Sequence, residues 1–117
     1  MTCAHDLARL RAGLQPDSAP SSDFDLNPGT VLPEGRKLRP AGVLVAFQAG
    51  PRGLELLLTK RSSRLKHHPG QIAFPGGKRD PEDADDTAAA LREAHEEVAL
   101  SPQTVEVLGH LPQHETV

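Results

Sequence analysis

Three glutamates in the second half of the chain have the spacing of a metal-binding carboxylate group. Glu93, Glu96 and Glu97 stand at positions i, i+3 and i+4. In a helix, this spacing places all three carboxylates on one side. Carboxylates so close together repel one another, and a hard divalent cation relieves that repulsion. The spacing therefore predicts a site for Mg²⁺ or Mn²⁺, and the alternative is a solvated acidic helix face.

The charges around these glutamates separate into a basic and an acidic segment. No Asp or Glu lies between Glu55 and Asp80, an interval that holds six of the 13 Lys and Arg residues. These six are Lys60, Arg61, Arg64, Lys66, Lys78 and Arg79. From Asp80 to Glu97 there are eight of the 16 Asp and Glu residues, and Arg92 is the one Lys or Arg. Such a pair of segments suits a phosphate substrate handled through a divalent metal.

The element that must carry the glutamates is a helix over residues 87–100. Thr87 or Asp86 is expected to cap its N-terminus, and three consecutive alanines favour helix in its first turns. Its apolar residues share one face: Leu91, Ala94 and Val98. On the polar side, Arg92 is placed to pair with Glu96 four residues later and to hold it in place.

Two apolar segments before this helix predict a hairpin in a largely buried sheet. Residues 41–47 (AGVLVAF) and 54–61 (LELLLTKR) are expected to pair through a turn at 48–53. Phe47 is expected in the core.

Further short elements complete this part of the chain. Residues 71–74 (QIAF) predict a short strand, with Phe74 in the core, and a tight turn follows at Pro75–Gly77. The two glycines of that turn allow a ligand or the following loop to approach the backbone closely. Residues 104–111 have strand character.

The first 40 residues have a different composition. A helix is expected over Asp6–Leu14, with Leu7 and Leu10 on its apolar face, and residues 15–39 are dominated by Pro, Ser, Asp and Gly. The predicted organisation is thus an N-terminal helix and arm over 1–40 and a folded domain over 41–117.

Composition excludes several classes of protein. The 117 residues correspond to one domain, and no apolar run approaches the ~18 residues of a membrane helix. The net charge of −3 argues against nonspecific nucleic-acid binding. A single cysteine, Cys3, forms no internal disulfide, and the N-terminus lacks the apolar stretch of a secretion signal. We therefore expect a cytoplasmic protein that acts on a small molecule, with a homodimer left open.

Residues 77–100 resemble the Nudix box of the Nudix hydrolases. Gly77, five residues, Asp83, eight residues and then Arg-Glu-Ala-x-Glu-Glu follow the family's pattern in order. The chain departs from it in three places: Asp83 replaces Glu, one extra residue precedes Arg92, and Ala99 replaces the last Gly. An added loop residue costs little, and the spacing of the three glutamates is unchanged.

A second signature lies directly upstream. Residues 57–77 (LLTKRSSRLKHHPGQIAFPGG) are similar to the signature of the coenzyme A pyrophosphatase branch of the family, with Lys66 where Arg is usual. The resemblance implies hydrolysis of the pyrophosphate bond of coenzyme A or its derivatives, giving 3′,5′-ADP and 4′-phosphopantetheine. The alternatives are a Nudix hydrolase of another nucleoside diphosphate derivative of the ADP-ribose type, or an inactive truncated or binding module.

The resemblance also assigns roles to individual residues. It implies that Glu93, Glu96 and Glu97 are metal ligands for Mg²⁺ or Mn²⁺ and form the catalytic set together with Arg92. One of the glutamates, or a carboxylate absent from this chain, would act as general base. The residues expected to bind the substrate are Arg61, Lys66, His68, Gly76 and Gly77.

The fold that the resemblance implies is an α/β structure, a Nudix-type α/β/α sandwich around a mixed sheet. Residues 41–117 are too few to complete it, so we expect its C-terminal part to be missing. A truncated chain is the favoured explanation, and a pseudogene-like product or completion by a partner chain are the alternatives.

Overall fold

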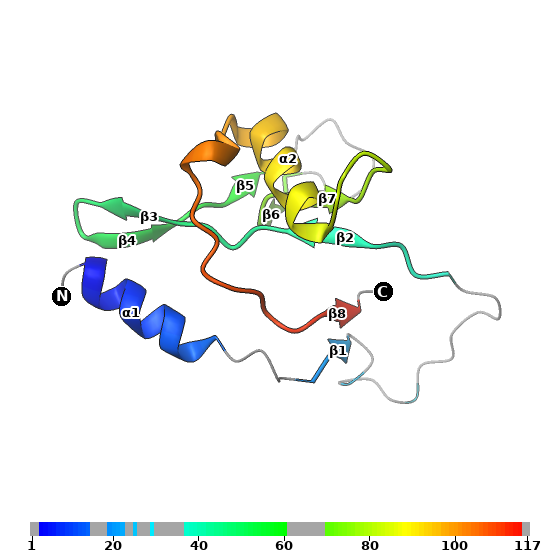
Figure 1. Ribbon diagram of the computed structural model, residues 1–117, viewed down its shortest axis with the longest axis horizontal. Coiled ribbons are helices and arrows are strands. Elements are labelled where there is room, and N and C mark those ends of the chain that lie inside the picture. The colour runs from blue at the N-terminus through cyan, green and yellow to red at the C-terminus, as the bar shows by residue number, and fades with distance from the viewer. Residues whose placement is uncertain are drawn as a thin grey trace. The chain divides into compact units, whose positions relative to one another are not determined.

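The computed structural model describes residues 3–14, 19–22, 25, 29, 37–60 and 70–115. It divides into two compact units, one formed by residues 39–106 and the other by residues 1–38 with 107–117. Figure 1 shows the course of the chain, and each unit is considered by itself. Within the described ranges, no helix is long and apolar enough to cross a membrane.

The unit formed by residues 39–106 has mixed α/β content, as the sequence predicts. Its elements in chain order are β2 (Ala41–Val43), β3 (Phe47–Gly50), β4 (Gly53–Leu56), β5 (Thr59–Lys60), β6 (Ile72–Ala73), β7 (Gly76–Lys78), α2 (Asp86–Val98) and the 3-10 helix η2 (Pro102–Thr104). The strands pair antiparallel, β2 with β7, β3 with β4 and β5 with β6.

The predicted hairpin is confirmed only for its inner part. Strands β3 and β4 pair with Phe47 opposite Leu56, through a connection of Pro51 and Arg52. Gly53 follows this turn with a φ of 114°, which favours glycine. The expectation that 41–43 belongs to the same hairpin is wrong, because this tight turn sets the register and β2 pairs with β7 instead.

The predicted tight turn at Pro75–Gly77 is also wrong. Gly76–Lys78 is strand β7, with Gly77 opposite Gly42 of β2. Pro75 is fully buried, and its carbonyl accepts a hydrogen bond from the Leu44 N–H at 2.8 Å. The two glycines therefore extend a strand pair, which satisfies the backbone hydrogen bonds that a turn would leave open. The short strand predicted at 71–74 is confirmed as β6.

Small residues allow helix α2 to lie almost directly on the backbone of β2 and β7 (Figure 1). A Cβ atom on Gly42 would collide with the Asp86 carbonyl oxygen and would lie 2.7 Å from the Ala90 amide nitrogen. On the helix side the buried residues are Ala89, Ala90 and Ala94. This contact is the core of the unit. The predicted apolar helix face is confirmed, with Leu91 and Val98 half-buried beside Ala94.

The expectation that Phe47 and Phe74 lie in the core is wrong, since they are 41% and 40% exposed. Side chains alternate between the two faces of a strand. Gly42 faces α2, so Val43, which is 60% exposed, points to the opposite face. Large apolar side chains are exposed in these strands and in the residues beside them: Val43, Val45, Phe47, Leu56, Leu58, Ile72 and Phe74. In the described part of the chain, these large apolar residues are thus less buried than Ala89, Ala90 and Ala94 of α2.

Helix α2 begins at a side-chain N-cap and ends at a residue in a left-handed conformation. The N-cap is Asp85, whose Oδ1 accepts from the Ala88 N–H at 2.8 Å, so the predicted cap at Asp86 or Thr87 is wrong. Asp85 fits because it is the residue directly before the first helical one, and its backbone is extended. At the other end, Ala99 takes a left-handed conformation with φ 58°. Ala99 stands where the Nudix box pattern has its last Gly, and a left-handed conformation at the end of a helix favours glycine.

The second unit contains helix α1 (Cys3–Gly13) and a parallel pair formed by β1 (Ser21–Ser22) and β8 (His114–Glu115). The helix predicted from Asp6 is confirmed and begins earlier. Ser21 Oγ lies 2.8 Å from His114 Nδ1 across the pair.

Two other predictions concern these outer segments. The strand expected at 104–111 is wrong, because η2 is followed by irregular backbone that pairs with no strand among the described residues. Most of the predicted arm over 15–39 lies outside the described residues. The division of the chain near residue 40 stays a prediction.

We predict that Gly42→Ala lowers the free energy of unfolding by about 2 kcal/mol, the cost of forcing extra volume into a packed contact. The new methyl group would meet the backbone of α2, which cannot move without moving the helix. Urea unfolding followed by circular dichroism measures the change.

Gly50→Ala is the matched control. A Cβ there would meet only the end of the flexible Glu55 side chain, so stability should change by less than about 0.5 kcal/mol. Equal losses in the two variants would contradict the close packing of α2 on β2.

Candidate active site

The side chain of Arg92, on the second turn of α2, connects the helix to the loop that precedes it. Its Nε donates to Asp83 Oδ1 at 3.0 Å, and its Nη2 donates to Asp83 Oδ2 at 3.0 Å. Two parallel hydrogen bonds of this kind fix both the distance and the orientation of a guanidinium and a carboxylate. Asp83 is the one buried charged residue in the described part of the chain, with 8% exposure.

The same guanidinium holds other parts of the loop after β7. Its Nη2 donates to the Lys78 carbonyl at 3.0 Å and lies 3.4 Å from Asp80 Oδ2. The Asp80 N–H in turn donates to Asp83 Oδ2 at 2.8 Å. The loop is therefore closed on itself around Asp83 and tied to the helix through Arg92.

On its other side, Arg92 faces two of the three predicted metal ligands. Its Nη1 lies 3.2 Å from Glu93 Oε1 and 3.3 Å from both carboxylate oxygens of Glu96. The predicted pair of Arg92 with Glu96 is confirmed. The guanidinium of Arg92 thus contacts two of the glutamates, Glu93 and Glu96, and the loop after β7 at the same time.

These contacts change the proton affinities of the strongest pair. The hydrogen bond from Arg92 lowers the pKa of the Asp83 carboxyl, and the Asp80 N–H lowers it further, against the opposing effect of burial. The pKa of Arg92 is raised, first through its hydrogen bond to Asp83. Both groups therefore stay charged throughout the neutral range. The sequence marks Asp83 only as the substitute for a box glutamate, and its pairing with Arg92 was not predicted.

The glycines of β7 make room for the other carboxylate contacts. A Cβ on Gly77 would lie 2.6 Å from Glu93 Oε1, so any side chain there would displace that carboxylate. The neighbouring Gly76 N–H donates to Glu97 Oε1 at 3.4 Å. The glycines do permit a close approach, but the group that approaches is the helix with its glutamates and not the following loop. Approach of a ligand to these glycines stays a prediction.

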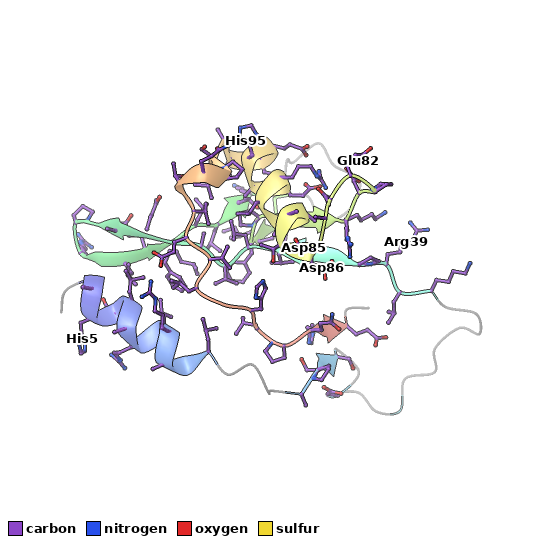
Figure 2. The ribbon with its side chains drawn as sticks, viewed as in Figure 1. His5, Arg39, Glu82, Asp85, Asp86 and His95 are labelled. Carbon is purple, nitrogen blue, oxygen red and sulfur yellow. The ribbon has the colours of Figure 1, made fainter. Side chains whose placement is uncertain are left out.

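Three residues predicted to bind the substrate lie outside the described part of the chain. Arg61, Lys66 and His68 belong to residues 61–69, outside the described ranges, and their roles stay predictions. His95 is exposed and lies toward the C-terminal end of α2, away from Asp85 and Asp86 at its start (Figure 2).

The chemistry of Glu93, Glu96 and Glu97 fits a hard divalent cation, since they offer carboxylate oxygens and no softer ligand. Glu93 and Glu97 both contact the Gly76–Gly77 backbone, and Glu96 is 57% exposed at the outer side of Arg92. In the residues that the structure describes, no three His, Cys, Asp or Glu side chains are already placed to hold a metal ion. Metal binding by these glutamates stays a prediction.

Comparisons with known proteins identify the family of the chain. The family model for the NUDIX domain matches residues 37–117, more than half of the chain. Over 69 residues the chain is 59% identical to a mouse protein named peroxisomal coenzyme A diphosphatase NUDT7, covering 59% of this chain and 29% of that protein.

Bacterial proteins are similar to the chain as well, and one of them matches over a longer stretch. Over 96 residues the chain is 54% identical to an Escherichia coli (strain SMS-3-5 / SECEC) protein named uncharacterized Nudix hydrolase NudL, covering 82% of this chain and 50% of that protein. A protein of the same name from Enterobacter sp. (strain 638) is 61% identical over 62 residues, 53% of this chain and 32% of its own length. The chain thus spans half or less of the length of these curated relatives.

We predict that Asp83→Asn destabilises the protein at neutral pH and that the difference from wild type shrinks in acid. A carboxyl whose pKa is lowered by folding contributes stability above its unfolded pKa of about 3.9, and that contribution is lost as the pH falls through its folded pKa. Urea unfolding over a series from neutral pH to about pH 2.5 measures both quantities.

Glu82→Gln is the control for Asp83→Asn, because it removes an exposed carboxylate from the same loop. It should leave the pH dependence of stability unchanged. A deficit in Asp83→Asn that stays constant across the whole pH series would show that the ion pair with Arg92 is not its cause.

Proposed function

The chain belongs to the Nudix family, and on this premise we propose that it hydrolyses the pyrophosphate bond of coenzyme A or a coenzyme A derivative. The products would be 3′,5′-ADP and 4′-phosphopantetheine. The observation that carries the proposal is the arrangement of Glu93, Glu96 and Glu97 around Arg92 and the glycine strand β7. The name of the mouse relative supports coenzyme A as the substrate.

In this proposal Glu93, Glu96 and Glu97 are ligands for Mg²⁺ or Mn²⁺. A divalent cation bound there would neutralise the charges of the phosphates and activate a water molecule. Arg92 would keep the Glu93 and Glu96 carboxylates oriented before any ligand arrives, since its hydrogen bonds to Asp83 and Lys78 restrain the guanidinium. Orientation of this kind lowers the reorganisation that the reaction would otherwise require.

The reaction itself needs one water molecule and one base. The oxygen of water forms a bond to one phosphorus of the diphosphate, and the bond from that phosphorus to the bridging oxygen breaks. One of the glutamates takes the proton that water loses. Each product carries one terminal phosphate group. Water is the only reactant besides the substrate, and no oxidant is needed.

Recognition of the substrate is proposed for the basic segment. Arg61 and Lys66, which are positively charged, and His68, whose ring can donate a hydrogen bond, would contact the phosphates. The backbone of Gly76 and Gly77 would lie beside the bound diphosphate. A cytoplasmic location and a homodimer stay predictions.

Product analysis tests the substrate assignment. The purified 117-residue chain is incubated with coenzyme A, ADP-ribose or NADH in the presence of Mg²⁺ or Mn²⁺, and the products are separated by chromatography and identified by mass. We expect 3′,5′-ADP and 4′-phosphopantetheine from coenzyme A. Cleavage of ADP-ribose with coenzyme A left intact would refute the proposed substrate and retain the family's chemistry.

Separate substitutions Glu93→Gln and Glu97→Gln should each lower kcat by at least ~100-fold, the usual worth of a metal ligand or a general base. Each removes a negative charge and keeps nearly the same volume, so thermal unfolding should change little. Glu82→Gln, at an exposed carboxylate of the preceding loop, is the control and should keep wild-type turnover. Wild-type activity in either glutamate variant would count heavily against the assignment.

A further inference from the structure

A second arginine holds the loop between β7 and α2 from the side of the strands. Arg79 directly follows β7, and its N–H donates to the Pro40 carbonyl at 3.0 Å. This hydrogen bond continues the pairing of β2 with β7 by one residue. The backbone of Arg79 is therefore fixed to the same strand pair on which α2 packs.

The side chain of Arg79 then reaches forward across the loop. Its Nη2 donates to the Ala84 carbonyl oxygen at 3.0 Å, and its Nη1 lies 3.7 Å from Asp86 Oδ1. That carboxylate oxygen is buried, and no described residue donates a hydrogen bond to it. Both side chains are partly exposed, so the ion pair alone is weak and the hydrogen bond to Ala84 is the more important contact.

The two arginines hold adjacent residues of one loop. Arg92 binds the side chain of Asp83 from the helix, and Arg79 binds the carbonyl of Ala84 from the strand. Only Ala84 and Asp85 separate Asp83 from Asp86, the first residue of α2. An attachment at the Ala84 carbonyl therefore restrains the backbone directly beside Asp83.

We propose that Arg79 is a positioning residue for the active site. By holding Ala84 it fixes Asp83, and Asp83 in turn fixes the guanidinium that orients Glu93 and Glu96. The effect on turnover rests on the proposed function, whereas the effect on the position of Arg92 does not. Small displacements of a catalytic group lower the rate of reaction without weakening the binding of substrate in proportion.

Arg79→Ala and Arg79→Lys test this in the 117-residue chain, with Arg52→Ala as the control. Arg52 is an exposed arginine in the turn between β3 and β4, so its loss removes the same charge far from the loop in sequence. Steady-state kinetics with coenzyme A give kcat and KM. Nitrogen-15 NMR gives the rate at which the Arg92 Nε–H exchanges with solvent, a readout that needs no activity.

We expect Arg79→Ala to lower kcat about tenfold, a factor equivalent to about 1.4 kcal/mol, with KM changed less than about twofold. The Arg92 Nε–H should exchange faster, because its hydrogen bond to Asp83 opens more often. Arg79→Lys should lie between wild type and Arg79→Ala, since an ammonium can donate to the Ala84 carbonyl but lacks the second arm that faces Asp86. Arg52→Ala should match wild type in both measurements.

Two results would overturn the inference. A raised KM with unchanged kcat in Arg79→Ala would make Arg79 a cation that binds substrate. An unchanged exchange rate of the Arg92 Nε–H would show that Asp83 holds its position without Arg79. If Arg79→Ala does not fold, the same two criteria apply to Arg79→Lys. Absence of coenzyme A hydrolysis in the wild-type chain would reject the proposed function, and the exchange measurement would still decide the role of Arg79.

Discussion

The arrangement of the site depends on the paired hydrogen bonds between Arg92 and Asp83. A carboxylate with 8% exposure is stable in its charged form only when its oxygens accept hydrogen bonds, and Arg92 with the Asp80 N–H provides them. This requirement fixes the guanidinium, and the remaining arm of the same guanidinium fixes Glu93 and Glu96. The loop, the helix and the glutamates are thus organised around one buried charge.

A second constraint is the short distance between α2 and the backbone of β2 and β7. It is possible because Gly42 and Gly77 have no side chains and because the buried helix face is made of alanines. The same closeness lets the Glu93 carboxylate lie against β7. It also leaves little volume in this contact, so the larger apolar residues, such as Phe47, occupy the other face of the strands, where they remain exposed. The lack of Tyr and Trp is consistent with a core built from small residues.

Predictions from the sequence succeeded where the determining interactions are local. The helix that carries the glutamates, its apolar face and the pair of Arg92 with Glu96 all follow from contacts within four residues along the chain. The predictions failed where a segment had to choose a partner far away in sequence. Residues 41–43 were assigned to the neighbouring hairpin and pair with β7 instead, and Gly76–Lys78 is a strand because β2 lies beside it.

The sequence by itself determined the family, the spacing of Glu93, Glu96 and Glu97 and the separation of basic from acidic segments, because these are properties of residue order. Only the tertiary structure decided that Asp83 is the main partner of Arg92 and that β7 supports the glutamates. Asp83 precedes Arg92 by nine residues and meets it only because the loop folds back over the helix. Such a contact depends on how the loop closes and how the helix packs. Neither can be predicted from the spacing of neighbouring residues along the chain.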